Sequence, residues 1–188
     1  MDKPLIGEKI AVLVSNGFSE QDFIQIQRLM QEMGGVMRIV SMNNGLTSSW
    51  NGSDWGLNFA ADAVLNEALA ADYSMLVMPG GQRSADKLKH TAHTRRFING
   101  FVDSGKPVIA MGEALELFAF AEKMSGMSVT GADAQREMAE QAGATWVDES
   151  YAIDGHVMTM VGLSAESSDV LAAIKEFLVA DSMLVEAA

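Results

Sequence analysis

The chain contains no cysteine among its 188 residues. This absence excludes disulfide bonds, thiolate metal sites and any reaction that starts with a cysteine nucleophile. The chain also lacks an uninterrupted apolar run of the roughly 18 residues that a membrane-spanning helix needs. Its first residues, MDKPLIGEKI, contain no apolar segment typical of a secretory signal. We therefore expect a soluble cytoplasmic protein with no membrane partner.

Positive charge is scarce as well. The sequence has 13 Lys and Arg residues against 25 Asp and Glu residues, a formal net charge of −12, and its basic residues are scattered apart from the short HTRR segment. Such a charge repels phosphate backbones, so we expect no nucleic-acid partner. Apolar residues make up 48% of the chain, and this composition and length predict one domain over residues 1–188 with a sizeable core.

Short apolar segments alternate with longer segments of helical period along the chain. Four apolar segments are continuous and rich in Val, Ile, Leu and Met, as strands buried on both faces are. They are residues 9–15, 37–42, 73–79 and 106–111. The segment between the first two carries an apolar helical stripe formed by Phe23, Ile26, Leu29, Met30 and Met33, ended by Gly34 and Gly35. This alternation predicts an α/β fold with a doubly wound, mainly parallel sheet and helices on both faces.

The remaining segments complete this pattern. Residues 43–59 are rich in Gly, Asn and Ser, which predicts a β-hairpin or a long loop. Helices closed by glycine are expected at 94–105 and 113–126, and a last helix at 164–180 with Ser164 as its N-cap and Ser167 completing only a partial capping box. Two late strands, 145–153 and 156–162, are expected to meet at a turn formed by Asp154 and Gly155.

In a doubly wound sheet, ligands bind in the crevice at the carboxyl ends of the strands. The segments expected there are NGFSEQDF, PGGQRSADKL and GEALELF. Gly80 and Gly81 can adopt positive φ and turn backbone N–H groups toward a ligand oxygen, as in an oxyanion hole. A tight turn without a ligand would need the same two glycines.

The segment AMGEALELF, residues 110–118, predicts a sharp turn from a buried strand into a helix. In many α/β enzymes this turn, the elbow, carries a nucleophilic Ser or Cys. Here Gly112 stands at its apex and Glu113 follows. The elbow therefore offers no side-chain nucleophile.

Taken together, these segments resemble the ThiJ/PfpI superfamily. KIAVLVSNGFSEQDF, YSMLVMPGG, GKPVIAMGEA, GMSVTG and IDGHVMTMVG occur in the order and spacing of that family and cover nearly the whole chain. The resemblance implies a flavodoxin-like fold related to class I glutamine amidotransferase domains. The family includes intracellular proteases, protein deglycases, glyoxalases, chaperones and enzymes that process small aldehydes or isocyanides, and most members share one reactive thiol.

The elbow departs from the family pattern. That pattern resembles Ala-x-Cys-His-Gly, and laid over AMGEA it puts Gly112 at the cysteine, Glu113 at the histidine and Ala114 at the glycine. A nucleophile at an elbow holds a strained backbone at a cost on the order of 1–3 kcal/mol, which glycine avoids. A chain without a nucleophile is expected to relax in this way.

Two further polar positions of the family site also differ. The glutamate that follows the family's first strand and hydrogen-bonds its thiol falls on Ser19, and a later histidine of some members falls on Ala132. The resemblance therefore predicts where the family pocket lies in this chain. Within that pocket, only the Gly81 region keeps the family pattern. These pocket residues are Ser19, Gly80, Gly81, Gly112 and Glu113.

The elbow is also similar to that of the carboxy-terminal domain of large-subunit catalases. That domain has the same fold, lacks the thiol and carries Lys-Pro-Ile followed by Ala-Gly-Asp-Ala, which KPVIAMGEA resembles. It binds no haem and has no settled activity. The present chain is similar to a free-standing relative of it, a cysteine-free pseudoenzyme.

Two polar candidates have alternative interpretations. Glu113 is the candidate catalytic residue, a general base in the crevice, but acidic residues in a first helical turn also simply favour the helix dipole. Ser19 is a possible nucleophile, but no histidine lies where the family motifs would place its base. A role as N-cap of the helix that starts near Glu20 is enough to explain a serine at this position. Capping is the favoured interpretation of Ser19.

The histidines and methionines suggest metal sites only weakly. His90 and His93 are three residues apart but have no acidic or thiolate partner at motif spacing, so a solvated basic patch with Arg95 and Arg96 is favoured. His156 follows the late turn, where it either approaches the crevice or begins an exposed strand. Most of the 14 methionines lie in apolar runs as core residues rather than as copper ligands. We expect no metal and no cofactor.

Trp50 and Trp55 lie in the Gly-rich segment 43–59. Large apolar side chains on an excursion of this kind often cover a pocket or a partner. With the resemblance, whose members usually pair, they predict a symmetric homodimer.

Two function classes follow from the sequence. The first is a non-catalytic ThiJ/PfpI-like protein that binds a small-molecule ligand or a partner, or stabilises an oligomer. The alternative is a hydrolase or lyase with rebuilt chemistry, which uses Glu113 as base and the Gly81 N–H as oxyanion donor and takes its nucleophile from water or substrate.

Overall fold

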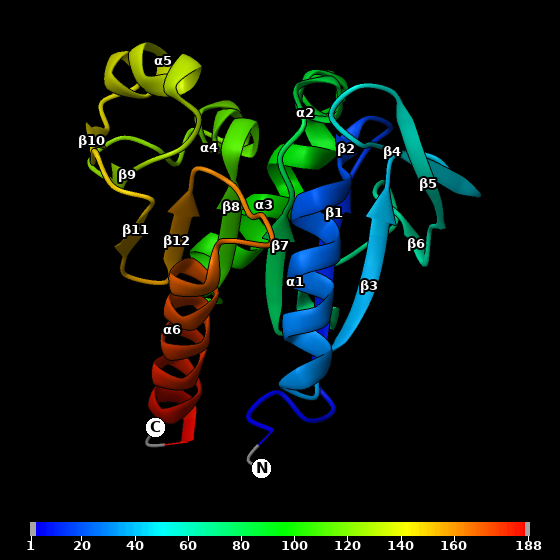
Figure 1. Cartoon of the computed structure of the whole chain (residues 1–188), viewed down its shortest axis with the longest axis horizontal. Helices are drawn as coiled ribbons and strands as arrows, with labels where there is room; N and C mark the ends of the chain where they lie inside the picture. The colour runs from blue at the N-terminus through cyan, green and yellow to red at the C-terminus, as the bar shows by residue number, and fades with distance from the viewer. Residues whose placement is uncertain (1–2, 187–188) are drawn as a thin grey trace.

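A seven-stranded sheet forms the centre of the computed structural model, which describes residues 3–186 (Figure 1). Its order is β11-β12-β8-β7-β1-β3-β6, and all neighbours are parallel except β11 and β12. The strands are β1 (Lys9–Val14), β3 (Val36–Ser41), β6 (Ala63–Val64), β7 (Met75–Met78), β8 (Val108–Met111), β11 (Tyr151–Asp154) and β12 (Val157–Met160). The first two and last two residues of the expected domain, 1–188, lie outside the described residues.

Helices cover both faces of this sheet. In Figure 1, α1 (Glu20–Glu32) and α6 (Ser168–Glu186) lie side by side on one face. On the other face lie α3 (Ala92–Asp103) and α4 (Leu115–Phe120). The remaining helical segments are α2 (Gln82–Leu88), α5 (Arg136–Gln141), η1 (Ala70–Asp72), η2 (Gly112–Ala114) and η3 (Asp133–Gln135). The expected doubly wound α/β fold is therefore confirmed.

Each face of the sheet has its own hydrophobic core, because alternate residues of a strand point to opposite faces. In β1, Ile10, Val12 and Val14 pack toward α1 and α6. Ala11 and Leu13 pack toward α3 and α4. Burial on both faces explains why β1 reads as a continuous apolar run rather than an alternating one.

Most of the expected elements are found within one or two residues of their predicted ends. The four predicted core strands are β1, β3, β7 and β8. Helix α1 buries the predicted stripe and is followed by Gly34 at φ +89°. Strands β11 and β12 meet at the predicted Asp154-Gly155 turn.

The predicted strand 145–153 was wrong, because the structure divides it into β10 (Thr145–Trp146) and β11, which belong to different sheets.

Three predicted helix ends were also wrong. The last helix, α6, continues to Glu186, beyond its predicted end at residue 180. Helix α6 begins at Ser168, because Ser164 and Ser167 form a separate turn in which the Ser164 N–H donates to the Ser167 hydroxyl at 2.9 Å. Such local hydrogen bonds compete with the helix. The helix expected at 113–126 ends at Phe120, before a left-handed residue, Glu122, at φ +60°.

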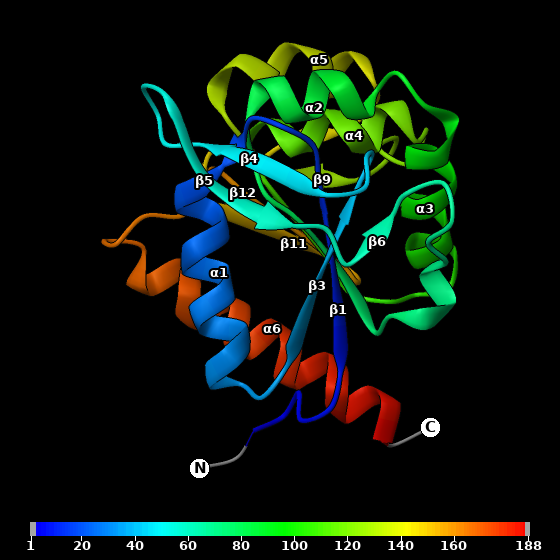
Figure 2. The same ribbon diagram turned by 90° about the vertical axis from the view of Figure 1, so that its right-hand side faces the viewer.

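The segment 43–59 forms a hairpin rather than a long loop. Strands β4 (Leu46–Trp50) and β5 (Trp55–Ala60) pair antiparallel, and β4 also pairs with β2 (Phe18–Ser19). Figure 2 shows the hairpin beside the N-terminal end of α1. There the Glu20 carboxylate accepts hydrogen bonds from the Ser49 hydroxyl at 2.5 Å and the Leu57 N–H at 2.6 Å. The hairpin is thus held above the carboxyl ends of the main strands.

The remaining short pair, β9 (Ser128–Val129) and β10 (Thr145–Trp146), lies near α5. Over residues 3–186, no helix is both long enough and apolar enough to cross a membrane.

Candidate functional site

The elbow lies where β8 passes into η2. Gly112 has φ +51° and is buried. A Cβ atom built on it would lie 3.2 Å from the Val161 carbonyl oxygen and 3.9 Å from the Gly80 Cα. A side chain at this position would therefore combine an unfavourable backbone conformation with a tight contact.

Glu113 is bound to the backbone of the neighbouring loop. Its Oε2 accepts a hydrogen bond from the Gly81 N–H at 2.9 Å. The Gly81 N–H, the candidate oxyanion donor, is thus already hydrogen-bonded to Glu113, the candidate base. Gly81 itself is required by the turn, since it has φ +110° and an added Cβ would collide with the Gly17 carbonyl oxygen.

A second carboxylate, from Asp22, completes the floor of the site. Asp22 is only 5% exposed. Its Oδ1 accepts from the Leu163 N–H at 2.8 Å and its Oδ2 from the Gly80 N–H at 2.9 Å. Burial raises the pKa of Asp22 above its ordinary 3.8, the negative charge of Glu113 adds to the rise, and the two N–H groups oppose it. Asp22 thereby joins α1 to the loops that follow β7 and β12.

Sequence reasoning missed Asp22, although its position carried a signal. Asp22 lies four residues before Ile26 and seven before Leu29, so it falls on the apolar stripe of α1. An acidic residue on a buried face is unusual and needs partners.

Ser19 is the N-cap of α1, as predicted. Its hydroxyl oxygen accepts the Asp22 N–H at 3.3 Å. In a capping box, an acidic side chain three residues after the N-cap accepts the N-cap N–H. Asp22 occupies this position, but its side chain instead accepts the N–H groups of Gly80 and Leu163 in two neighbouring loops.

A cavity of about 440 Å³ opens beside these groups. Ser19, Gly81 and Glu113 line it together with Asp22. Gly80 donates its N–H to Asp22 and directly precedes Gly81 in the chain. Gly112 directly precedes Glu113. Of the five residues that the resemblance placed in the pocket, three line this cavity, and the other two, Gly80 and Gly112, are next to them but do not line it.

The hairpin and α2 contribute the rim of the cavity. Trp50 and Arg83 both line it. The Arg83 guanidinium carbon lies 3.9 Å from the ring centroid of Trp50, and Trp55 packs edge-on against Trp50 at 5.6 Å. Sequence reasoning did not single out Arg83, because nothing in the motif PGGQR shows that a tryptophan 33 residues earlier packs against it.

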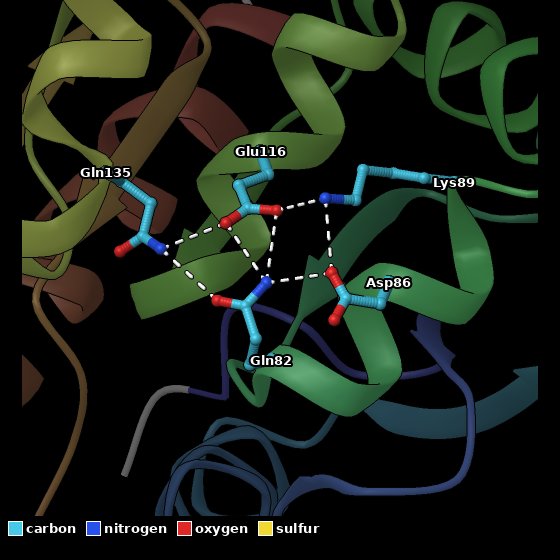
Figure 3. A network of polar contacts seen from close by, with 5 residues as sticks. All are labelled: Gln82, Asp86, Lys89, Glu116 and Gln135. Atoms are coloured by element: carbon cyan, nitrogen blue, oxygen red, sulfur yellow. Dashed lines mark hydrogen bonds and ion pairs between the residues drawn. The ribbon is translucent and has the colours of Figure 1, made fainter.

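A polar network links α2 to α4 and η3 (Figure 3). The Glu116 carboxylate accepts from Gln135 at 3.0 Å, from Gln82 at 3.1 Å and from Lys89. Burial of Glu116 favours its neutral form, but these hydrogen bonds and the Lys89 charge outweigh it, so the pKa of Glu116 is lowered. The network ties α2, which carries Gln82 and Arg83, to α4 and η3.

The other candidate residues lie outside this site. His90 and His93 are exposed, and no group of three or more metal-ligating side chains occurs among the described residues. His156 is exposed and pairs with Asp181 of α6 at 2.9 Å. Many methionines are core residues, among them Met30, Met75, Met78, Met111, Met158 and Met160.

Comparisons with known proteins agree with the expected family. The chain is 26% identical over 149 residues to protein/nucleic acid deglycase 2 of Escherichia coli K12, which covers 79% of this chain and 85% of that protein. Among solved structures, a ThiJ/PfpI domain protein from Brachyspira murdochii matches with a TM-score of 0.78 at 17% identity, covering 98% of this chain and 99% of that one.

A two-domain protein from Anabaena variabilis, with DJ-1/ThiJ/PfpI-like and ferritin-like domains, matches with a TM-score of 0.75 at 24% identity. The match covers 82% of this chain and 43% of that protein. The sequence profile of the DJ-1/PfpI family matches residues 8–176. This chain, with its cysteine-free elbow, therefore belongs to the DJ-1/PfpI family.

Proposed function

We propose that this protein is a non-catalytic member of the DJ-1/PfpI family that binds a small molecule in the cavity beside Glu113. The observation that carries the proposal is the state of the elbow. Gly112 provides no nucleophile, and Glu113, at the position of the family histidine, is hydrogen-bonded to the Gly81 N–H. An elbow without nucleophile or free oxyanion donor keeps the family cavity but loses the means of covalent catalysis.

Two resemblances support this proposal in different ways. The E. coli relative is named a deglycase, and it is 26% identical to the present chain. The present chain, however, contains no cysteine. The elbow KPVIAMGEA also resembles the thiol-free carboxy-terminal domain of large-subunit catalases. Both resemblances are compatible with a retained fold whose chemistry has been lost.

A second candidate function is a hydrolase or lyase with rebuilt chemistry. One observation favours it, because the cavity brings two carboxylates together and burial raises the pKa of one of them, Asp22. Glu113 would act as the base toward water or substrate. This reaction first requires the hydrogen bond between Glu113 and Gly81 to break, because the oxyanion donor is otherwise occupied.

The two functions are separated by activity and binding measured on the same preparation. We expect no turnover of peptides or methylglyoxal above buffer, and we expect small fragments to shift NMR resonances of residues around Ser19, Gly81 and Glu113. Turnover that is abolished by Glu113→Gln would overturn the non-catalytic proposal and favour the rebuilt enzyme. A broad fragment library that shifts no cavity resonance would refute the binding function.

We further propose that the protein acts in the cytoplasm as a symmetric homodimer. The support is the exposure of three apolar side chains on the β4–β5 hairpin, Leu46, Trp55 and Leu57. The hairpin also lines the cavity through Trp50, so pairing at this surface would bring a second copy close to the ligand site.

A further inference from the structure

Two charged side chains that line the cavity, Glu113 and Arg83, have hydrogen-bonding atoms without a partner among the described residues. Asp22 is not one of them, because each of its oxygens already accepts a backbone N–H. Glu113 uses Oε2 for Gly81, and Oε1 accepts no hydrogen bond from the described residues. The floor of the cavity thus offers one free carboxylate oxygen to a ligand.

Arg83 is the second open group. Among residues 3–182, whose side chains the structure describes, no carboxylate lies within ion-pair distance of its guanidinium. A guanidinium has several N–H donors in a planar fork that matches a carboxylate. The rim of the cavity therefore offers an unpaired cation with directional donors.

Packing holds Arg83 in this position. Its aliphatic stem lies against Gly17, where an added Cβ would be 2.5 Å from the Arg83 Cβ. Its head lies on the Trp50 ring. The preceding residue, Gln82, is held by Glu116 and Asp86 at the start of α2 (Figure 3). An arginine ordered in advance loses less conformational entropy when it binds a ligand.

We infer that the cavity binds a small zwitterion, whose carboxylate pairs with Arg83 and whose ammonium group pairs with Glu113. This inference rests on the proposed binding function and adds the ligand class. Free amino acids and ω-amino acids have this chemistry, and a cavity of about 440 Å³ accommodates them. The ring of Trp50 and the backbone of the hairpin tip provide the wall along the methylene chain of the ligand.

The test uses ligands that differ only in charge and spacing. Isothermal titration calorimetry with glycine, β-alanine, γ-aminobutyrate and δ-aminovalerate varies the distance between the charges. For the best-binding length, the acid without the amine and the amine without the acid are the matched controls. For γ-aminobutyrate these are butyrate and butylamine. We expect the zwitterion to bind at least about tenfold more tightly than either control, because each charge-assisted contact contributes separately.

Two variants assign each end of the ligand. Arg83→Gln should lower the affinity for the zwitterion to that of the amine, and Glu113→Gln should lower it to that of the acid. Arg28→Gln and Glu166→Gln alter exposed residues outside the cavity and should leave affinity unchanged. Thermal unfolding of each variant shows whether its fold is retained.

Several results would overturn the zwitterion. Butyrate that binds as tightly as γ-aminobutyrate would indicate a simple anion site, and butylamine that does so would indicate a simple cation site. Affinity unchanged in Arg83→Gln would also contradict the inference. If neutral fragments shift the cavity resonances while no amino acid binds, the zwitterion is wrong and the binding function stands. If no compound of any class binds, both proposals fail.

Discussion

The carboxylate of Glu113 and the backbone N–H of Gly81 are joined by a hydrogen bond of 2.9 Å across the mouth of the elbow. One residue comes from η2 and the other from the loop after β7, so the bond links two neighbouring carboxyl ends of the sheet. In a catalytic elbow, such an N–H would face the substrate. Here it is used to hold the loop.

The first prediction concerns this bond. Glu113→Ala should lower the free energy of unfolding by about 1 kcal/mol, because the half-buried Gly81 N–H loses its acceptor. Glu113→Gln retains an acceptor oxygen and should cost less. Urea denaturation measures both, with Glu166→Ala, an exposed residue, as the control. Equal stability of the wild type and Glu113→Ala would show that the bond contributes nothing.

The second prediction concerns the elbow glycine. Gly112→Cys should destabilise the protein by about 1 kcal/mol or more, because φ is positive and the new Cβ meets the Val161 carbonyl. It should not restore hydrolase or glyoxalase activity, since the family histidine and glutamate are absent as well.

A comparison of two alanine variants isolates the contact with Val161. Gly126 also has positive φ, +81°, but nothing lies within 4 Å of its built Cβ. Gly126→Ala therefore carries only the backbone cost, and Gly112→Ala should be the more destabilising of the two. A denaturation midpoint that is unchanged or raised in Gly112→Cys would mean that the turn has another shape in solution.

The third prediction is a pH dependence at Asp22. Asn offers one acceptor oxygen where Asp22 accepts two backbone N–H groups, so Asp22→Asn should destabilise by about 1–3 kcal/mol. The folded-state pKa of Asp22 is raised, so protonation of Asp22 stabilises the fold. This stabilisation is fully present below the ordinary pKa of 3.8 and is lost as pH rises through the folded-state pKa. The stability gap between wild type and variant should therefore widen from about pH 7 toward about pH 4. A gap that narrows on acidification would contradict this assignment.

The fourth prediction has the opposite sign. The pKa of Glu116 is lowered, so its stabilising contribution is present above its ordinary pKa of 4.5 and is lost as pH falls through the folded value. Glu116→Gln should cost about 1–3 kcal/mol near neutral pH, since it breaks charge-assisted bonds to Lys89 and leaves Gln82 and Gln135 with a weaker acceptor. The gap to wild type should close in acid.

The neighbouring Asp86 provides the control for that measurement. Its side chain is 55% exposed, against 15% for Glu116. Asp86→Asn should therefore change stability by only about 0.5 kcal/mol. Equal costs for the two variants would show that the network of Figure 3 acts as an ordinary set of surface charges.

The sequence was sufficient for the fold because the strands of the main sheet are buried on both faces and read as continuous apolar runs. It was also sufficient to place Ser19, Gly81 and Glu113 at one crevice, since they follow strands that end at the same edge. Arg83 and Trp50 could not be paired in advance, because their contact depends on how the hairpin folds back over α2. The start of α6 was misplaced because two serine side chains compete locally with the helix, and sequence spacing does not decide that competition.

The last prediction is the homodimer. On the β4–β5 hairpin, Leu46 is 67%, Trp55 50% and Leu57 56% exposed, so three large apolar side chains of one element face the solvent. Trp50 is half-buried beneath Arg83, so Trp55 and Leu57 are the better test of the interface.

Trp55→Ala and Leu57→Asp should weaken the dimer, because the first removes apolar area and the second places a charge at a desolvated contact. The net charge of −12 is compatible with pairing, since charges at the rim of an interface stay solvated and are screened at physiological salt. Leu69→Asp is the matched control, because Leu69 is 53% exposed but lies outside the hairpin. Sedimentation equilibrium at micromolar concentration decides the question. A monomer at every accessible concentration defeats the proposal, and a dimer that only Leu69→Asp disrupts would move the interface to another face of the molecule.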